Sequence, residues 1–261
     1  MSLYIQQSGR HDAPALILLH GWGMSSAIWQ GWLPVLEREY QVITVDLPGL
    51  GKSSFAGDQP YRLDTLADLI VEQITPRLTA SALWLGWSLG GLVAAQIAQR
   101  CSEKVSGLIT ISTSPCFVQR PDWPEAMLAE TFNSFQDSLA LNPQKTLTRF
   151  AMLQGQGDPD ARALLRRLKP IIAESVAGAS RLSESLALLA DDYRSLFAEL
   201  SVPRLFLFAD NDALVPGAVS QSELLRNHAH LLADAGHVPF INSEPVVTQV
   251  INDWVRELAD G

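Results

Sequence analysis

Residues 81–91 read SALWLGWSLGG, and this stretch decides the fold. The apolar run from Ser81 to Leu85 is typical of a buried strand, and Gly91 to Arg100 has the pattern of a helix. Between them lies Gly-Trp-Ser-Leu-Gly, so the order is strand, G-x-S-x-G, helix. That order is the context of a nucleophile elbow, a sharp turn that holds a serine hydroxyl out of the chain. We therefore predict that Ser88 is a catalytic nucleophile.

A serine hydroxyl is a weak nucleophile at neutral pH and needs a general base beside it. The five histidines of the chain are the candidates for this base. In enzymes with this elbow the chain order is serine, then acid, then histidine. His237 follows Gly236 in a loop after the apolar run 230–233, and we predict that it is the base. The other four histidines are expected to be solvated or structural, with His20 shaping a turn.

Two aspartates are candidates for the acid that orients the base. Asp210 and Asp212 both follow the strand-like run Val202–Phe208. Open α/β sheets build their sites just past the ends of strands, which suits either residue. Asp46 precedes Ser88 in the chain and is expected to brace a tight loop instead.

Hydrolysis of an ester also needs two N–H donors for the oxyanion of the tetrahedral intermediate. One is the backbone N–H of the residue after the nucleophile, here Leu89. The other comes from a loop after an early strand, and His-Gly-Trp-Gly at 20–23 follows the apolar run 15–19. We predict Trp22 and Leu89 as the donors. This chemistry needs no cofactor and no metal.

Strand-like and helix-like stretches alternate over residues 1–115, which predicts an α/β fold with a mostly parallel sheet and helices on both faces. The predicted strands are 15–19, 41–45, 82–85 and 105–111, and the predicted helices are 27–39, 64–78 and 89–100.

The alternation stops after Pro115 and returns after Ala190. We therefore predict a hydrolase-like core, 1–115 and 191–261, with an inserted helical cap, 116–190, that forms a lid over the site. Predicted helices of the cap are 123–141, 143–153, 159–168 and 180–189, and the core resumes with strands 203–208 and 230–232 and a helix over 245–258.

The composition excludes several classes of protein. The net charge of −9 disfavours nucleic acid as a partner. No run of 18 apolar residues occurs, so no membrane segment is predicted. The first residues lack a basic and apolar leader, so we expect no signal peptide and a cytoplasmic location. We also expect a monomer. Cys101 and Cys116 have no metal-binding spacing.

The chain resembles the α/β-hydrolases over its whole length. Beyond the fold, it resembles the carboxylesterases of biotin synthesis, which cleave the methyl ester of pimeloyl-acyl carrier protein. The likeness is carried by residues 20–23, 84–94, 114–117 and 214–216. It implies Ser88 and His237 as nucleophile and base. Asp212 is the implied acid, since it stands three residues before Val215-Pro216, and Asp210 becomes a turn residue.

The resemblance also implies a carrier-protein contact on the cap, where cationic side chains of the family bind the acidic carrier and its phosphopantetheine. Residues 116–190 hold eight of the 19 basic and eight of the 28 acidic residues, so the rest of the chain carries the whole negative charge. Trp87 and Phe150 are expected either to line the acyl channel or to belong to the core. The expected contact residues lie at helical spacing in two pairs, a pattern that a solvated helix face with local ion pairs would also give. The pairs are Lys145 with Arg149 and Arg162 with Arg166.

Two other functions use the same residues. A generalist short-chain carboxylesterase, a lactonase or a C–C bond hydrolase would share the triad but have no carrier partner. A ligand receptor built on a hydrolase scaffold would turn over little. Serine rather than aspartate at position 88 disfavours a dehalogenase.

Overall fold

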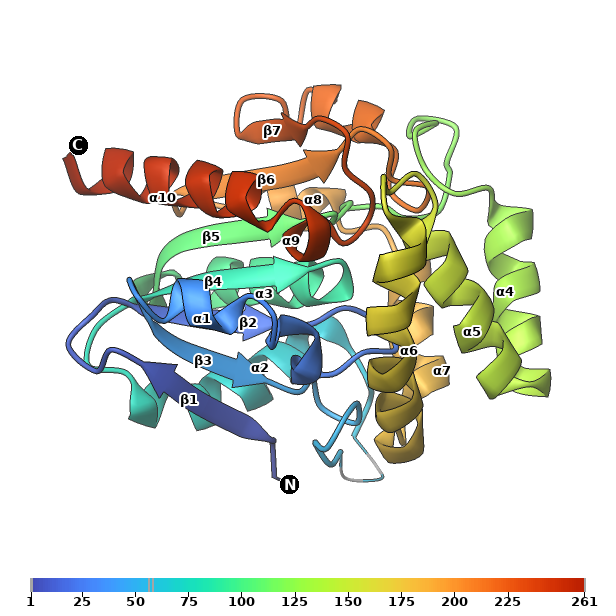
Figure 1. Ribbon diagram of the computed structural model, residues 1–261, viewed down its shortest axis with the longest axis horizontal. Helices are drawn as coiled ribbons and strands as arrows, with labels where there is room; N and C mark the ends of the chain where they lie inside the picture. Colours follow the sequence, from blue (N-terminus) through green and yellow to red (C-terminus); the bar gives the residue numbers. More distant parts are fainter. Residues whose placement is uncertain (1, 56, 58, 261) are drawn as a thin grey trace.

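The computed structural model describes residues 2–55, 57 and 59–260, and its centre is one β-sheet (Figure 1). In this described part of the chain the sheet has seven strands in the order β1-β3-β2-β4-β5-β6-β7. β1 pairs antiparallel with β3, and all the other pairs are parallel. The strands are β1 (Ile5–Gly9), β2 (Ala15–Leu19), β3 (Gln41–Val45), β4 (Ala82–Trp87), β5 (Val105–Ile111), β6 (Arg204–Ala209) and β7 (Ala229–Leu232).

Helices cover both faces of the sheet, as a parallel sheet requires. In Figure 1, α1, α9 and α10 lie in front of the sheet, and α2, α3 and α8 lie behind it. Among the described residues no helix is both long and apolar enough to cross a bilayer. The helices that cover the sheet are α1 (Leu33–Leu36), α2 (Leu63–Ile74), α3 (Leu89–Arg100), α8 (Arg194–Ala198), α9 (Pro239–Asn242) and α10 (Glu244–Asp260).

A separate group of helices comes between β5 and β6. They stand beyond the carboxyl ends of the parallel strands, on the right in Figure 1. We call this group the cap; the limits predicted for it, 116 and 190, stay a prediction. Its position covers the edge of the sheet where an α/β fold places its site. The cap helices are α4 (Ala129–Leu141), α5 (Pro143–Gly155), α6 (Ala161–Gly178) and α7 (Leu182–Ala187).

Several predicted helices are shorter than expected, and two of them show the reason clearly. The helix predicted over 27–39 is a 3₁₀ turn, Ser26–Trp29, followed by α1. Exposed Gly31 separates them, and glycine in a helix interior is unfavourable because it loses the most backbone entropy. The helix predicted over 123–141 begins only at Ala129, because residues 118–127 form a loop whose bridge pairs Val118 with Met127.

The N-terminal strand was not predicted at all. Residues 5–9 read IQQSG, too polar for a buried strand, and several of them are exposed. The segment becomes a strand because the exposed edge of β3 offers it an antiparallel ladder, with Ile5 opposite Val45. An edge strand with one solvated side does not need an apolar sequence.

Candidate active site

Ser88 stands at a strained turn between β4 and α3. Its φ of 54° and ψ of −118° lie outside the regions that side-chain-bearing residues prefer. The turn is tight: a Cβ at Gly86 would lie 2.2 Å from the Gly90 carbonyl oxygen, and one at Gly90 would lie 2.2 Å from that of Leu19. Glycine on both sides of Ser88 therefore lets α3 approach β4 and β2 closely enough to form this turn.

This packing predicts a loss of stability for Gly90→Ala. The added methyl group meets backbone rather than a movable side chain, so the strands and α3 must separate. We expect the free energy of unfolding to fall by about 1–3 kcal/mol or more, as for other overpacked cores. Gly31→Ala is the matched control, because nothing lies within 4 Å of its Cβ position. Urea unfolding of both variants measures the difference, and equal midpoints would contradict the packing argument.

His237 and Asp212 form a buried pair. His237 Nδ1 lies 2.8 Å from Asp212 Oδ2, and the two side chains are at most 1% exposed. The other carboxylate oxygen, Oδ1, accepts hydrogen bonds from the backbone N–H groups of Leu214 and Val215, at 2.8 and 3.0 Å. These bonds fix the carboxylate, which accepts a hydrogen bond from the Nδ1–H of the imidazole. The lone pair of His237 is thereby left on Nε2, the form that a general base needs.

Asp210, the other aspartate considered for the acid, has a different partner. Its Oδ1 accepts the backbone N–H of Ala235 at 3.2 Å, and the residue is exposed. It thus ties the loop after β6 to the loop that leads to His237. Asp212 is therefore the aspartate that contacts His237, and Asp210 is a turn residue.

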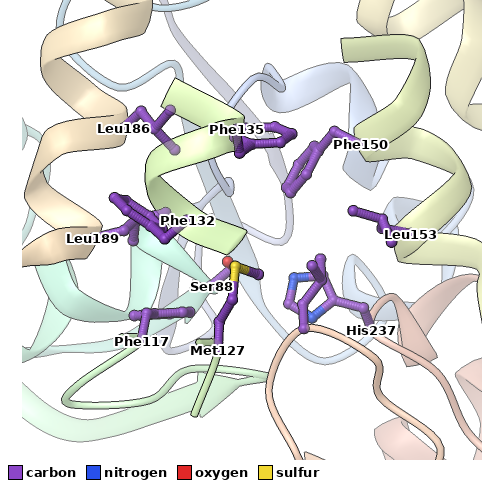
Figure 2. A pocket seen from close by; sticks show the side chains of 11 residues that line it. Ser88, Phe117, Met127, Phe132, Phe135, Phe150, Leu153, Leu186, Leu189 and His237 are labelled. Carbon is purple, nitrogen blue, oxygen red and sulfur yellow. The ribbon is translucent and has the colours of Figure 1, made fainter. Parts of the chain in front are cut away.

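Ser88 and His237 lie together at the base of one cavity (Figure 2). His237 Nε2 is buried and has no hydrogen-bond partner in the described part of the chain. The two side chains are not hydrogen-bonded to each other. Catalytic contacts are often long in the absence of substrate and tighten when it binds. The arrangement can therefore pass a proton from a serine hydroxyl to an imidazole that a carboxylate orients.

The two backbone N–H groups predicted to bind the oxyanion belong to segments that reach Ser88. Leu89 is the first residue of α3, where an N–H has no acceptor in its own helix. The loop that contains Trp22 comes up to Ser88 from β2: a Cβ at Gly21 would lie 3.3 Å from the Ser88 Cβ. Among the hydrogen bonds of residues 2–55, 57 and 59–260, neither the Trp22 nor the Leu89 N–H donates to another group. Both groups are free to bind an oxyanion.

His20 and Asp46 support this loop from below. His20 Nδ1 lies 2.8 Å from the Gly21 carbonyl oxygen, and the Leu47 N–H donates to its Nε2 at 2.9 Å. An imidazole with these partners is neutral. Burial also lowers the pKa of His20, which favours the same neutral form. The buried Asp46 carboxylate accepts two backbone N–H bonds from neighbouring loops, at 2.6 and 2.8 Å. Both residues brace loops, as the sequence indicates.

The cavity above Ser88 and His237 is apolar. Figure 2 shows side chains from the cap enclosing it on several sides. Phe150 is one of them, as expected; the others were not predicted individually, although amphipathic cap helices indicate that some of their apolar side chains face the core. Such a lining suits an acyl chain. The remaining lining residues are Phe117, Met127, Phe132, Phe135, Leu153, Leu186, Leu189 and Leu214.

Of the two positions expected for Trp87, the structure shows the core position, because Trp87 does not line this cavity. Its ring is fully buried, edge-on to Trp29 and Phe240, and tilted against His237. The indole N–H donates to the His237 carbonyl oxygen at 2.9 Å. Since side chains alternate along a strand, Trp87 at the end of β4 points into the core beside His237. It supports the base and does not contact the space for an acyl chain.

Of the four cationic residues expected on the cap, Arg149 lines a hollow that adjoins the cavity. A second hollow, open to the surface, is lined by Arg149 and residues of α4 such as Glu130 and Ser134. This hollow shares the side chains of Met127, Phe135 and Leu153 with the apolar cavity, so it adjoins the cavity from outside. Lys145, Arg162 and Arg166 lie on α5 and α6, outside both spaces. All four are exposed, and none has an ion-pair partner within 4.0 Å among the described residues.

The family model described as "alpha/beta hydrolase fold" matches residues 14–244. The chain belongs to the α/β-hydrolase fold family.

Within this family its sequence is similar to the pimeloyl-[acyl-carrier protein] methyl ester esterases. It is 37% identical to that of Aeromonas hydrophila over 260 residues, 98% of this chain and 100% of the relative. It is 38% identical to that of Sodalis glossinidius, over 97% and 98% of the two chains. Among solved structures, an esterase from Exiguobacterium antarcticum shares the fold with a TM-score of 0.85 at 23% identity, over 97% and 95% of the chains.

Proposed function

We propose that this protein is a serine carboxylesterase that hydrolyses the methyl ester of pimeloyl-acyl carrier protein in biotin synthesis, acting as a cytoplasmic monomer. The observation that carries the proposal is the base of the apolar cavity, where Ser88 lies beside a His237 that is hydrogen-bonded to Asp212 at 2.8 Å. The full-length relatives supply the substrate, since their names give this ester.

In the proposed mechanism Ser88 Oγ attacks the ester carbonyl carbon while His237 Nε2 takes its proton. Asp212 holds the imidazole in the required tautomer and stabilises the imidazolium. The N–H groups of Trp22 and Leu89 bind the oxyanion. Loss of either donor would raise the activation barrier by about 2.7–4 kcal/mol. The tetrahedral intermediate then collapses, and His237 gives its proton to the methoxide oxygen as the C–O bond breaks, so methanol departs. Water attacks the acyl-enzyme by the same route and releases the free carboxylate.

The substrate suits the two adjoining spaces. A pimeloyl chain is apolar between its two ends, which favours the phenylalanine- and leucine-lined cavity with the methyl ester at Ser88. For the carrier end of the chain we propose the side of the outer hollow, which shares three lining side chains with the cavity and includes Arg149. A carrier protein with an acidic surface would be attracted to Lys145, Arg149, Arg162 and Arg166, on a protein whose other regions are acidic.

The test compares the methyl ester on the carrier with the same ester freed of the carrier. We expect Arg149→Glu to lower kcat/KM for the carrier-bound ester by about 10-fold, because a rim charge acts mainly on association. Lys145→Glu should act in the same direction. Neither change should alter hydrolysis of the free ester, and raised salt should shrink the difference.

Arg38→Glu is the control, since Arg38 is exposed on the core and far along the chain from the cap. Equal rates on carrier-bound and free ester in the wild type would favour a generalist esterase or lactonase. A single acylation event without turnover would favour a receptor. Growth without biotin of cells that lack their own methyl esterase is the corresponding genetic test.

A further inference from the structure

The turn between α5 and α6, residues 156–160, contacts both loops that carry the acid and the base. It belongs to the cap, whereas Asp212 and His237 belong to the core. The contacts are made by two neighbouring residues of the turn, Gly157 and Asp158. Neither residue faces the apolar cavity, so the mechanism above does not use them.

Gly157 lies against the loop of the acid. Its φ of +83° is in the left-handed region, and a Cβ there would lie 2.0 Å from the Asn211 carbonyl oxygen. Asn211 directly precedes Asp212, and its N–H donates to the Ala235 carbonyl oxygen at 3.0 Å. Only glycine allows the turn to approach this loop so closely.

Asp158 lies against the loop of the base. A Cβ at Gly236 would lie 3.3 Å from both the Cβ and the backbone nitrogen of Asp158. The Asp158 Oδ1 accepts two hydrogen bonds, from the Asn242 side-chain amide and from the Asp160 N–H, each at 2.8 Å. Asn242 ends α9, the helix that begins two residues after His237. Asp158 thus touches the chain on both sides of the base.

The carboxylate of Asp158 is an unusual choice for a turn, because it is only 8% exposed. Capping the start of α6 would not require a buried charge, since exposed Asp160 also accepts an N–H from the first turn of that helix, from Ala163 at 3.1 Å. What Asp158 adds is the bond to Asn242. A buried carboxylate that accepts a hydrogen bond from the amide N–H of another element fixes the distance between the two elements.

We propose that Asp158, seated by Gly157, is a positioning residue that ties the cap to the loops of Asp212 and His237 and so holds the catalytic pair in register. The proposal rests on the proposed esterase function. Catalysis is sensitive to such positioning, since a displacement of about 1 Å can cost 10²-fold in rate.

The test compares Asp158→Ala, Asp158→Asn and Asp160→Ala in hydrolysis of a p-nitrophenyl ester. We expect Asp158→Ala to lower kcat by about 10- to 100-fold with little change in KM. Asp158→Asn should recover most of kcat, because its amide oxygen can accept the same two bonds. Asp160→Ala removes a cap of the same helix without touching either loop, and it should keep the wild-type kcat.

A folded Asp158→Ala protein with wild-type kcat would overturn the proposal, as would equal losses for Asp158→Ala and Asp160→Ala. Should Asp158→Ala not fold, Asn242→Ala removes the donor instead, and a wild-type kcat in that variant would have the same meaning. The low-field NMR resonance of the His237 Nδ1 proton gives a readout without turnover, and we expect it to shift or broaden in Asp158→Ala. A wild-type protein without ester hydrolysis would overturn the proposed function, while the resonance would still test the positioning role.

Discussion

Ser88→Ala should reduce ester hydrolysis by on the order of 10⁴- to 10⁶-fold, because it removes the atom that forms the acyl-enzyme. The fold should survive, since alanine can replace serine at 4% exposure without a change in volume that the turn would feel. Substrate binding should also survive, because the apolar cavity and the N–H groups of Trp22 and Leu89 are intact. Steady-state kinetics on a p-nitrophenyl ester measures the loss, and mass spectrometry should find no acyl adduct on the variant.

Ser112→Ala is a matched control for this change. Ser112 is another buried serine at positive φ, 48°, and it follows the end of the neighbouring strand β5. Its hydroxyl has no hydrogen-bond partner in the described part of the chain. We expect the kcat of Ser112→Ala to stay within about threefold of the wild-type value, because the substitution breaks no hydrogen bond and leaves no large cavity. A Ser88→Ala protein that turns over at the wild-type rate would contradict the assignment of the nucleophile.

Asp212→Asn should lower kcat by about 10⁴-fold. The asparagine side chain has about the same shape, and its oxygen can still accept the N–H bonds of Leu214 and Val215. Stability should therefore change little. The amide has no negative charge to stabilise the imidazolium, and its NH₂ group favours the wrong tautomer of His237. The loss should appear in kcat rather than in KM.

Asp210→Asn is the internal control, two residues away on the same loop. Its carboxylate accepts one N–H from Ala235, a bond that an asparagine oxygen can also accept, so we expect a change of a few-fold at most. A large loss for Asp210→Asn together with a small loss for Asp212→Asn would contradict the pairing with His237. Kinetics of the two variants on one ester, with thermal unfolding as the check on folding, decides between them.

The order of the elements could be predicted because it is set by local patterns. Apolar runs of strand length and helical periodicity place β2, β3, β5 and α3 at their observed bounds, since burial on both faces demands apolar sequence. Local patterns fail where a segment takes its structure from a neighbour. The polar strand β1 forms only because β3 has a free edge. The sequence fits Trp87 equally as a channel or a core residue, and its packing against Phe240 and Trp29 shows that it belongs to the core.

By itself the sequence determined the α/β class, the turn at Ser88 and the roles open to His237, because a glycine-flanked serine between strand and helix has few other uses. The sequence favoured Asp212 over Asp210 by its place before Val215-Pro216, but only the tertiary structure showed its contact with the imidazole, and only that structure showed that Asp158 of the cap reaches the loop of the base. The reason is physical. Residues two apart in a loop have almost the same sequence context, and which side chain meets a partner 25 or 84 positions away depends on how the loops pack.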